Sequence, residues 1–516
     1  MVHHVLVIEN AKIISFSEEI EYGCIIIEED FIKEVKPDVE SCNTLNVPSS
    51  TRIDVKGKTV IPAFIDAHAH LLSLAKKYEW LDLSNVPTLD NLKKMLRKIA
   101  DKIGPGKWIL GYGWDESYWS DEKRFPTLKD LDEAVPDNPI LIRRVDGHMA
   151  VVNSQALMIL KIPENVRGLE KNKDGSPSGI IKEDALEYAL KKIQYSLENL
   201  KKGLKKITKS AWKKGVAASH ETCSMDDLTY LSYLLNEDEY LGIDFYLFIM
   251  DQFLDLIIEC GLHKVLGKRI KVRGIKVFSD GSIGARTAAL REPYSDDPTT
   301  KGLLLKDKDD LSNIFRKANK AGLQLAVHAI GDRAIDVVLD AFKEAGIDRE
   351  MRHRIEHFEL AHEEHIKDAK RLGIILSMQP NFVGQWQMPG GMYERRLGRS
   401  RWRKLNPFRQ IFDENLIVAF GSDCMPFDPI FGIWSAVNHP IEESRISVLE
   451  AIKAYTLNAA YAAHQENFRG DIRIGYKADL AILSQDPMSM SPKKLRDINV
   501  LGLILNGKVR YISIGL

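Results

Sequence analysis

Residues 59–70 read TVIPAFIDAHAH, a short β-branched run that ends in two histidines, His68 and His70. Side chains alternate along a strand, so residues two apart project from the same face. Two imidazoles on one face at the end of a strand form a chelating pair for a divalent metal ion. This stretch therefore predicts a buried strand with a metal site at its carboxyl end.

Seven further strand-like segments follow along the chain, most of them separated by helical segments. They are short and end in polar residues: 215–220, 243–250, 271–278, 323–328, 352–357, 373–378 and 416–423. Alternation of strand and helix predicts a parallel sheet with crossover helices. With 59–66 the strands number eight, which closes a (β/α)8 TIM barrel, so the expected fold class is α/β.

Four more candidate metal ligands lie in or at the end of these strands. They are Lys276 in the fourth strand, His328 in the fifth, His357 in the sixth and Asp423 in the eighth. The carboxyl ends of all barrel strands meet at one mouth, where active sites of this fold lie. Nitrogen and carboxylate ligands without thiolates suit Zn²⁺, with Fe²⁺, Mn²⁺ or Co²⁺ as alternatives.

The remaining sequence predicts two additions to the barrel. Both ends of the chain are β-rich, which favours one small β-sandwich built from 1–58 and 466–516; two independent β modules are the alternative. The barrel would then occupy 59–465. The gap between its first two strands is about 150 residues, so we expect an inserted cap at 80–182 and the first barrel helix at 183–213.

Composition excludes several classes of protein. The 516 residues include 72 Lys and Arg against 73 Asp and Glu, so no net charge favours nucleic-acid or membrane-surface binding. No apolar run approaches the ~18 residues of a membrane span, and the N-terminus does not resemble a signal peptide. Five scattered cysteines predict no disulfide framework and a cytoplasmic location. An excess of lysine over arginine with few glutamines is a feature of thermophilic proteins.

The full set of candidate ligands resembles that of the amidohydrolase superfamily, which uses HxH on strand one, Lys on strand four, His on strands five and six, and Asp on strand eight. TVIPAFIDAHAH is similar to the superfamily's strand-one signature, although Ala63 stands where glycine is usual. GWDESYW (113–119), GIKVFSDGSIGARTAAL (274–290) and LAVHAIGDRAID (325–336) resemble the N-substituted formamide deformylase-like branch, some members of which are called exoenzyme regulatory proteins.

This resemblance implies a binuclear site in which CO₂ carbamylates Lys276 and the carbamate bridges two metal ions, since an ammonium group offers no lone pair. The alternative is that Lys276 pairs with an acid such as Asp280 and one metal binds. A metal lowers the pKa of bound water to roughly 7. Asp423 is placed to accept a proton and deliver it to the leaving nitrogen. The expected reaction is metal-dependent hydrolysis of an amide or N-formyl C–N bond.

Three polar residues near the predicted mouth are candidates for substrate contact. His148 lies in the insertion and is expected to reach over the mouth; a structural role in the cap is the alternative. His220 and Glu221 end the second strand, where they line the pocket or hold a metal-bound histidine.

Three further candidates for substrate contact also have structural alternatives. Trp114 belongs to an aromatic cluster that forms either an apolar wall for the substrate or the core of the insertion. Arg286 and Arg333 follow the fourth and fifth strands and bind an anionic group or form surface ion pairs.

Two other functions fit the same fold. A mononuclear deaminase of a cyclic amidine lacks the strand-four lysine and carries a glutamate beside the strand-five histidine, whereas Ala-Ile-Gly-Asp follows His328 here. A catalytically silent regulatory or binding protein is the third interpretation, but all six ligand positions are filled. The expected partner is a small-molecule substrate, with no nucleic acid and no membrane. A homodimer is left open, because dimers are frequent in the family.

Overall fold

An eight-stranded parallel barrel lies at the centre of the computed structural model, which describes residues 5–17, 21–37, 51–193, 197–232, 242–261 and 269–513. Its strands pair in chain order: β6 (Phe64–Ala69), β13 (Val216–Cys223), β14 (Asp244–Met250), β15 (Ile270–Phe278), β16 (Gln324–Ala329), β17 (Arg354–His357), β18 (Ile375–Met378) and β19 (Val418–Phe420). The predicted α/β barrel is therefore confirmed.

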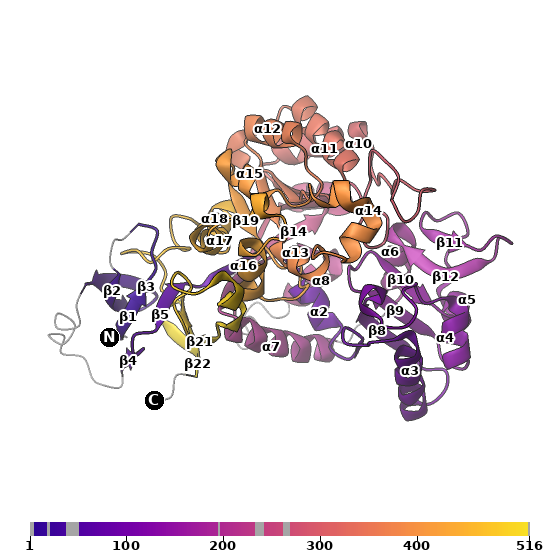
Figure 1. The fold of residues 1–516 in the computed structure, drawn as a ribbon, viewed down its shortest axis with the longest axis horizontal. Coiled ribbons are helices and arrows are strands. Elements are labelled where there is room, and N and C mark those ends of the chain that lie inside the picture. The colour runs from indigo at the N-terminus through magenta and orange to yellow at the C-terminus, as the bar shows by residue number, and fades with distance from the viewer. Residues whose placement is uncertain are drawn as a thin grey trace.

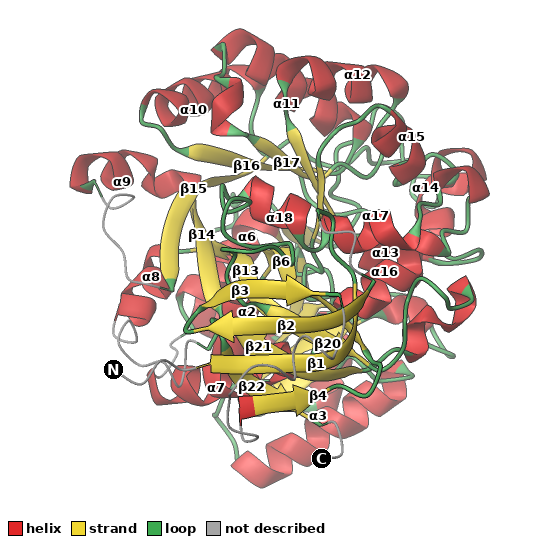
Figure 2. Ribbon diagram, turned by 90° about the vertical axis from the view of Figure 1, so that its left-hand side faces the viewer, coloured by secondary structure: helices red, strands yellow, loops and turns green. Residues whose placement is uncertain are grey.

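Helices surround the barrel strands (Figure 2). They are α2 (Leu71–Lys76), α6 (Glu183–Lys191), α7 (Leu197–Lys213), α8 (Met225–Ser232), α9 (Leu254–Cys260), α10 (Lys308–Lys320), α11 (Asp332–Ala345), α12 (Glu363–Leu372), α13 (Pro380–Trp386), α14 (Met392–Trp402), α15 (Phe408–Asp413), α16 (Pro429–Val437), α17 (Val448–Ala454) and α18 (Leu457–Ala462). Every residue of β16, β17 and β18 is buried, as expected for parallel strands covered on both faces.

The first and last strands adjoin through the segment that follows β19. The Asp423 N–H donates to the His68 carbonyl at 2.7 Å, and the Ser422 N–H donates to the Asp66 carboxylate at 2.9 Å. Gly421 is required for this approach, since a Cβ there would lie 2.3 Å from the His68 nitrogen. The contact brings the metal-ligand candidates of the two strands together.

The segment predicted as one strand at 59–66 is divided between two sheets, so that expectation was wrong in detail. β5 (Thr59–Pro62) pairs with the chain ends, and β6 begins at Phe64. Pro62 has no N–H to continue a ladder. The Ala63 N–H donates to the Asp479 carbonyl, and the Phe64 N–H donates to the Gly215 carbonyl, so the change of partner occurs between them.

Both ends of the chain join in one mixed sheet, which excludes two independent modules. Its strands are β1 (Val5–Ile13), β2 (Tyr22–Glu28), β3 (Phe31–Lys36), β4 (Arg52–Asp54), β5, β20 (Leu480–Leu483), β21 (Val500–Leu505) and β22 (Lys508–Ile512). The pairing of β5 with β20 connects the two ends. A second layer that would make this sheet a sandwich stays a prediction.

One cysteine departs from the expectation of free thiols. Cys24 in β2 is disulfide-bonded, whereas Cys223, Cys260 and Cys424 are free; Cys42 lies outside the described residues. The cysteine pattern therefore does not indicate a reducing compartment. Among the described residues, no helix has both the length and the apolar character needed to cross a membrane.

The segment between the first two barrel strands forms its own sheet. Its elements are β7 (Leu81–Asp82), α3 (Leu89–Ile103), β8 (Ile109–Trp114), α4 (Leu128–Ala134), β9 (Ile140–Arg144), β10 (Met149–Val152), α5 (Ser154–Leu160), β11 (Leu169–Lys171) and β12 (Pro177–Lys182). Figure 1 shows this insertion and the terminal sheet on opposite sides of the barrel. The helix predicted at 183–213 is two helices, α6 and α7, with 194–196 outside the described residues.

Candidate metal centre

Two histidines and one aspartate meet where the first and last barrel strands adjoin. His68 lies in β6, and His70 directly precedes α2. Asp423 Oδ1 lies 2.9 Å from His70 Nε2 and 3.7 Å from His68 Nε2. Each residue offers one ligand atom within 4.8 Å of the others. Imidazole nitrogen and carboxylate oxygen atoms so close together suit a divalent cation such as Zn²⁺.

The other two predicted histidines extend this group across the barrel mouth. The ring of His357 in β17 is 4.8 Å from the His68 ring, and the ring of His328 in β16 is 4.5 Å from that of His357. The His68 and His70 rings are 5.3 Å apart. We call His70, His68, His357 and His328 the histidine row. The structure thus brings together residues that are far apart in the sequence.

Burial favours neutral imidazoles at His68, His328 and His357. It lowers the pKa of His68 to about 4 and the pKa values of His328 and His357 well below the ordinary histidine value. A neutral imidazole offers the lone pair that a metal requires. Burial alone would raise the pKa of Asp423, but the adjacent His70 lowers it below its usual range. The site therefore combines neutral nitrogen ligands with an ionised carboxylate.

Lys276 is buried in β15 beside the histidine row, with 1% of its surface exposed. Its Nζ lies 5.0 Å from the centre of the Phe278 ring. Burial lowers the pKa of Lys276 to about 8. Within the described part of the chain, neither Lys276 Nζ nor His357 Nδ1 has a hydrogen-bond partner. Because unpartnered buried nitrogen atoms are costly, these two atoms fit a mouth that binds a cation and its ligands.

Asp280, the alternative partner for Lys276, is engaged elsewhere. Its carboxylate accepts backbone N–H groups at 2.9–3.1 Å, from Ala289, Ile330 and Gly331. These three donors hold Asp280 against the loops that follow β15 and β16. The geometry therefore does not support an ion pair between Asp280 and Lys276.

The sequence reasoning missed two residues that support His68. His68 Nδ1 contacts the Glu356 carboxylate, and Arg354 Nη2 donates to Glu356 Oε2 at 3.0 Å. Burial alone would raise the pKa of Glu356, but Arg354 and His68 keep it well below its usual range. An acceptor at Nδ1 leaves the His68 Nε2 lone pair for a metal. The signal in the sequence is two charged residues, Arg354 and Glu356, inside the buried strand RIEH (354–357).

His220 contacts a buried arginine of the barrel, and Glu221 contacts the start of α2. Arg354 Nη1 donates to His220 Nδ1 at 2.8 Å, so His220 acts on the same arginine that holds Glu356. The Glu221 carboxylate accepts the Leu72 N–H at 3.3 Å, and burial raises the Glu221 pKa to about 8. The structure thus places His220 behind a metal-ligand candidate and Glu221 beneath α2.

Three other predicted contacts lie away from the histidine row's polar groups. Trp114 is fully buried in the core of the insertion and donates to the Ile142 carbonyl at 3.1 Å. Arg286 forms an ion pair with Asp296 at 2.9 Å. Arg333 is exposed in the first turn of α11. These positions match the structural alternatives for Trp114 and Arg286.

His148 does reach the mouth from the insertion. Its ring is 5.2 Å from the His328 ring, and its Nδ1 lies 3.1 Å from the nearer oxygen of Glu183. Burial would lower the pKa of His148, but Glu183 raises it to about 9. The raised pKa favours a protonated His148 at neutral pH, whereas burial favours a neutral imidazole at the adjoining His328.

Comparison with known proteins agrees with this geometry. Residues 51–511 match the model of the amidohydrolase family. A putative amidohydrolase of Bacillus subtilis, YtcJ, is 31% identical, covering 90% of this chain and 91% of the relative. An N-substituted formamide deformylase of Arthrobacter pascens is 28% identical, covering 91% of each chain.

A solved structure is similar over nearly the whole fold. It is an uncharacterised metal-dependent hydrolase of Pyrococcus furiosus, with a TM-score of 0.75, 30% identity, and coverage of 94% of this chain and 100% of that chain. The resemblance drawn from the motifs is thus confirmed. The chain belongs to the amidohydrolase family and is a hydrolase that acts on carbon–nitrogen bonds other than peptide bonds.

Proposed function

We propose that the chain hydrolyses an amide or N-formyl bond with a divalent metal held at the barrel mouth. The observation that carries this proposal is the histidine row together with Asp423 and the two buried nitrogen atoms, Lys276 Nζ and His357 Nδ1, that have no hydrogen-bond partner among the described residues. The residues that would hold the metal are His68, His70, Lys276, His328, His357 and Asp423. Zn²⁺ suits this donor set, and Fe²⁺, Mn²⁺ and Co²⁺ are the alternatives.

The residues of the mouth divide the remaining work. A bound divalent metal supplies water whose pKa is lowered to roughly 7 and polarises the scissile carbonyl. Asp423 accepts a proton from the attacking water and passes it to the leaving nitrogen. Its lowered pKa means that it begins the cycle as a carboxylate. Glu356 and Arg354 hold the His68 ring in one orientation throughout.

Lys276 would act as a carbamate in this proposal. Its Nζ, as the neutral amine, would form a bond to the carbon of CO₂ and release a proton to solvent, giving an anionic carbamate whose oxygen atoms would serve as metal ligands. A pKa of about 8 favours the step, since a larger share of the amine is neutral than for an exposed lysine. Within the residues described, Nζ has no hydrogen-bond partner that would compete with this reaction.

The deformylase relative and the mouth geometry together direct the first assay. Purified protein is stripped of metal, reloaded separately with Zn²⁺, Mn²⁺, Co²⁺ or Fe²⁺, and offered N-substituted formamides, N-acetyl compounds and cyclic amidines. We expect a metal-dependent release of amine and acid from a formamide or an acetyl compound. Release of ammonia from amidines alone would favour the deaminase alternative. Less than one metal per chain and no turnover with any metal would indicate a silent protein.

A further inference from the structure

We propose that His148 is a substrate-contacting residue, whose Nε2 forms a hydrogen bond with the reacting amide, and that Glu183 positions it. This inference rests on the proposed function and gives the insertion a part in the reaction. The His148 ring extends the histidine row by one member, because it lies 5.2 Å from the His328 ring and 6.4 Å from the Phe278 ring. The His148 side chain is 17% exposed, so it borders the mouth.

Glu183 holds His148 at two points. Its carboxylate oxygens lie 3.1 and 3.2 Å from His148 Nδ1, and its backbone N–H donates to the His148 carbonyl at 3.2 Å. Since Nδ1 is engaged, Nε2 is the ring atom that remains for the substrate. Glu183 adopts a φ of +40°, a conformation that a non-glycine residue rarely takes. Such strain persists where the surroundings over-determine it, and it clusters at functional sites.

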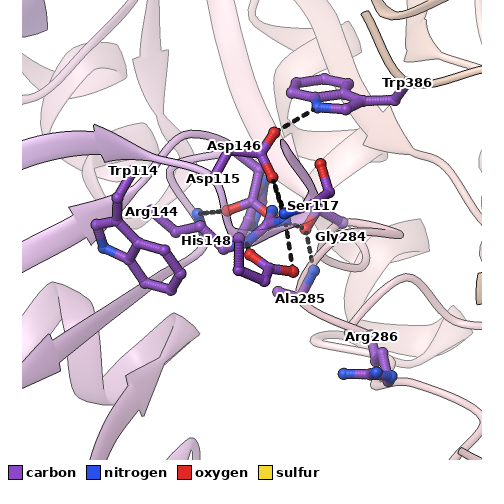
Figure 3. Close-up of polar contacts among 12 residues, drawn as sticks. Trp114, Asp115, Ser117, Arg144, Asp146, His148, Gly284, Ala285, Arg286 and Trp386 are labelled. Carbon is purple, nitrogen blue, oxygen red and sulfur yellow. Dashed lines mark hydrogen bonds and ion pairs between the residues drawn. The ribbon is translucent and has the colours of Figure 1, made fainter. Parts of the chain in front are cut away.

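A buried ionic network fixes the backbone that carries His148 (Figure 3). The His148 N–H donates to Asp146 Oδ1 at 3.2 Å, and Asp146 Oδ2 accepts Arg144 Nη1 at 2.7 Å. The same oxygen accepts the Ser282 hydroxyl at 2.8 Å, which ties the insertion to the loop after β15. Arg144 also donates to Glu116 at 2.9 Å. His148 is therefore held relative to the barrel, not only within the insertion.

Two glycines of the loop after β15 permit this close approach. A Cβ at Gly281 would lie 2.3 Å from a Glu183 oxygen, and a Cβ at Gly284 would lie 2.4 Å from Arg144 Nη1. The Gly281 carbonyl is also 3.1 Å from His328 Nε2. One loop thus contacts Glu183, Arg144 and His328, so it sets the distance between the insertion and the histidine row. This explains the glycines in GSIG (281–284).

The test compares His148→Ala, His148→Gln and Glu183→Gln with a matched control. His362→Ala is that control, because His362 is likewise partly exposed (19%), its Nε2 likewise lies near a carboxylate, 3.3 Å from Asp332, and it is not a member of the histidine row. For zinc-loaded protein acting on N-butylformamide, or on the active compound of the panel above, we measure kcat, KM, zinc per chain and the thermal midpoint. Removing one hydrogen-bond donor that stabilises the reacting group reduces kcat by ~10²–10³-fold.

We expect His148→Ala to lower kcat at least ~10²-fold with unchanged zinc content and thermal midpoint. Glu183→Gln should lower kcat less than His148→Ala does, and His148→Gln should retain part of the kcat that His148→Ala loses. The control His362→Ala should have the kcat of wild type. Unchanged kcat in a folded His148→Ala variant would overturn the proposal. Loss of zinc would also overturn it and make His148 a metal ligand. If zinc-loaded wild type hydrolyses nothing in the panel, the proposed function itself fails. If wild type is active and the variants have normal kcat, only the proposal about His148 fails.

Discussion

The barrel mouth and the Arg144 network, which joins Arg144 to Asp115, Glu116 and Asp146, both bury several charged or ligating groups. They differ in whether the protein supplies ionic and hydrogen-bond partners for these groups. Arg144 has a fully buried side chain and contacts three carboxylates at 2.7–3.3 Å, those of Asp115, Glu116 and Asp146. Lys276, equally buried, has no hydrogen-bond partner among the described residues. The Arg144 side chain is fully paired within the protein, whereas the mouth has polar atoms that no described residue satisfies.

This difference separates a structural role from a functional one. A buried charge is tolerated when it is paired and costly when it is not. The Arg144 network therefore accounts for the position of the insertion, and the mouth accounts for chemistry. Substitutions in the two regions should consequently affect different measurements.

The largest expected effect is that of Asp423→Asn on turnover. The amide cannot accept the proton, so kcat should fall by ~10²–10⁴-fold, while most of the metal remains on the histidines. Steady-state kinetics and metal analysis of the same preparation check this. Near-normal kcat would remove Asp423 from the role of proton acceptor.

Lys276→Ala should lose one metal and most of the activity, because the bridging ligand is absent. Short-chain carboxylic acids added with metal should restore part of the activity by occupying the cavity left by the side chain. Metal stoichiometry with and without the added acid is the measurement. An unchanged stoichiometry would indicate a mononuclear site in which Lys276 is not a ligand.

Arg144→Met should act mainly on stability, with a smaller loss of kcat because the same network fixes the backbone of His148. The buried carboxylates of Asp115 and Asp146 would lose their ion pair with Arg144, and Glu116 would keep its pair with Arg396; breaking a buried pair costs about 3–5 kcal/mol. We expect a lower thermal midpoint and an unchanged metal content, since every proposed ligand lies on the barrel. Lys94→Met is the control, because its ion pair with Asp90 is exposed and such pairs contribute below about 1 kcal/mol. Loss of metal in Arg144→Met would remove the distinction between the two regions.

A smaller effect concerns a histidine outside both regions. Burial lowers the pKa of His353 to about 4, and its Nδ1 accepts the Leu325 N–H at 3.0 Å. The unfolded chain therefore binds a proton below its ordinary pKa of about 6.5 that the folded protein does not bind. Stability is full above pH ~6.5 and declines towards pH ~4, by about 1.4 kcal/mol per pH unit at most.

His353→Gln should flatten this part of the dependence of unfolding on pH, since glutamine keeps an acceptor and does not titrate. Denaturant unfolding of wild type and variant between pH 4 and 7, with the metal state kept the same, isolates the contribution. Equal slopes in the two proteins would show that His353 is not kept neutral by folding.

The sequence predicted the parts of the molecule that depend on strand order. The positions of His68, His328, His357 and Asp423 at strand ends followed from short β-branched runs, because a closed parallel barrel has one mouth for all its strands. The division of 59–66 between two sheets did not follow, since a change of pairing partner at Ala63 leaves no mark on hydrophobic periodicity.

The supporting contacts were harder to predict because they depend on pairing between distant charges. Glu356 is visible as a charge in a buried strand, but its contact with His68 requires the barrel to close. Arg144 and Asp146 appear in the sequence as an ordinary polar segment, and only the close approach at Gly284 shows that they join the barrel loop. Side-chain partners across the insertion are set by tertiary docking, which local patterns do not encode.

The most direct test of the central claim is anomalous diffraction at the zinc edge from crystals of the zinc-loaded protein, with the electron density at Lys276 examined in the same data. We predict anomalous peaks bounded by the histidine row and Asp423, and density for a carbamate on Lys276 Nζ. A single peak with an unmodified Lys276 would contradict the bridged site. The absence of any peak at the histidine row would contradict the metal centre itself.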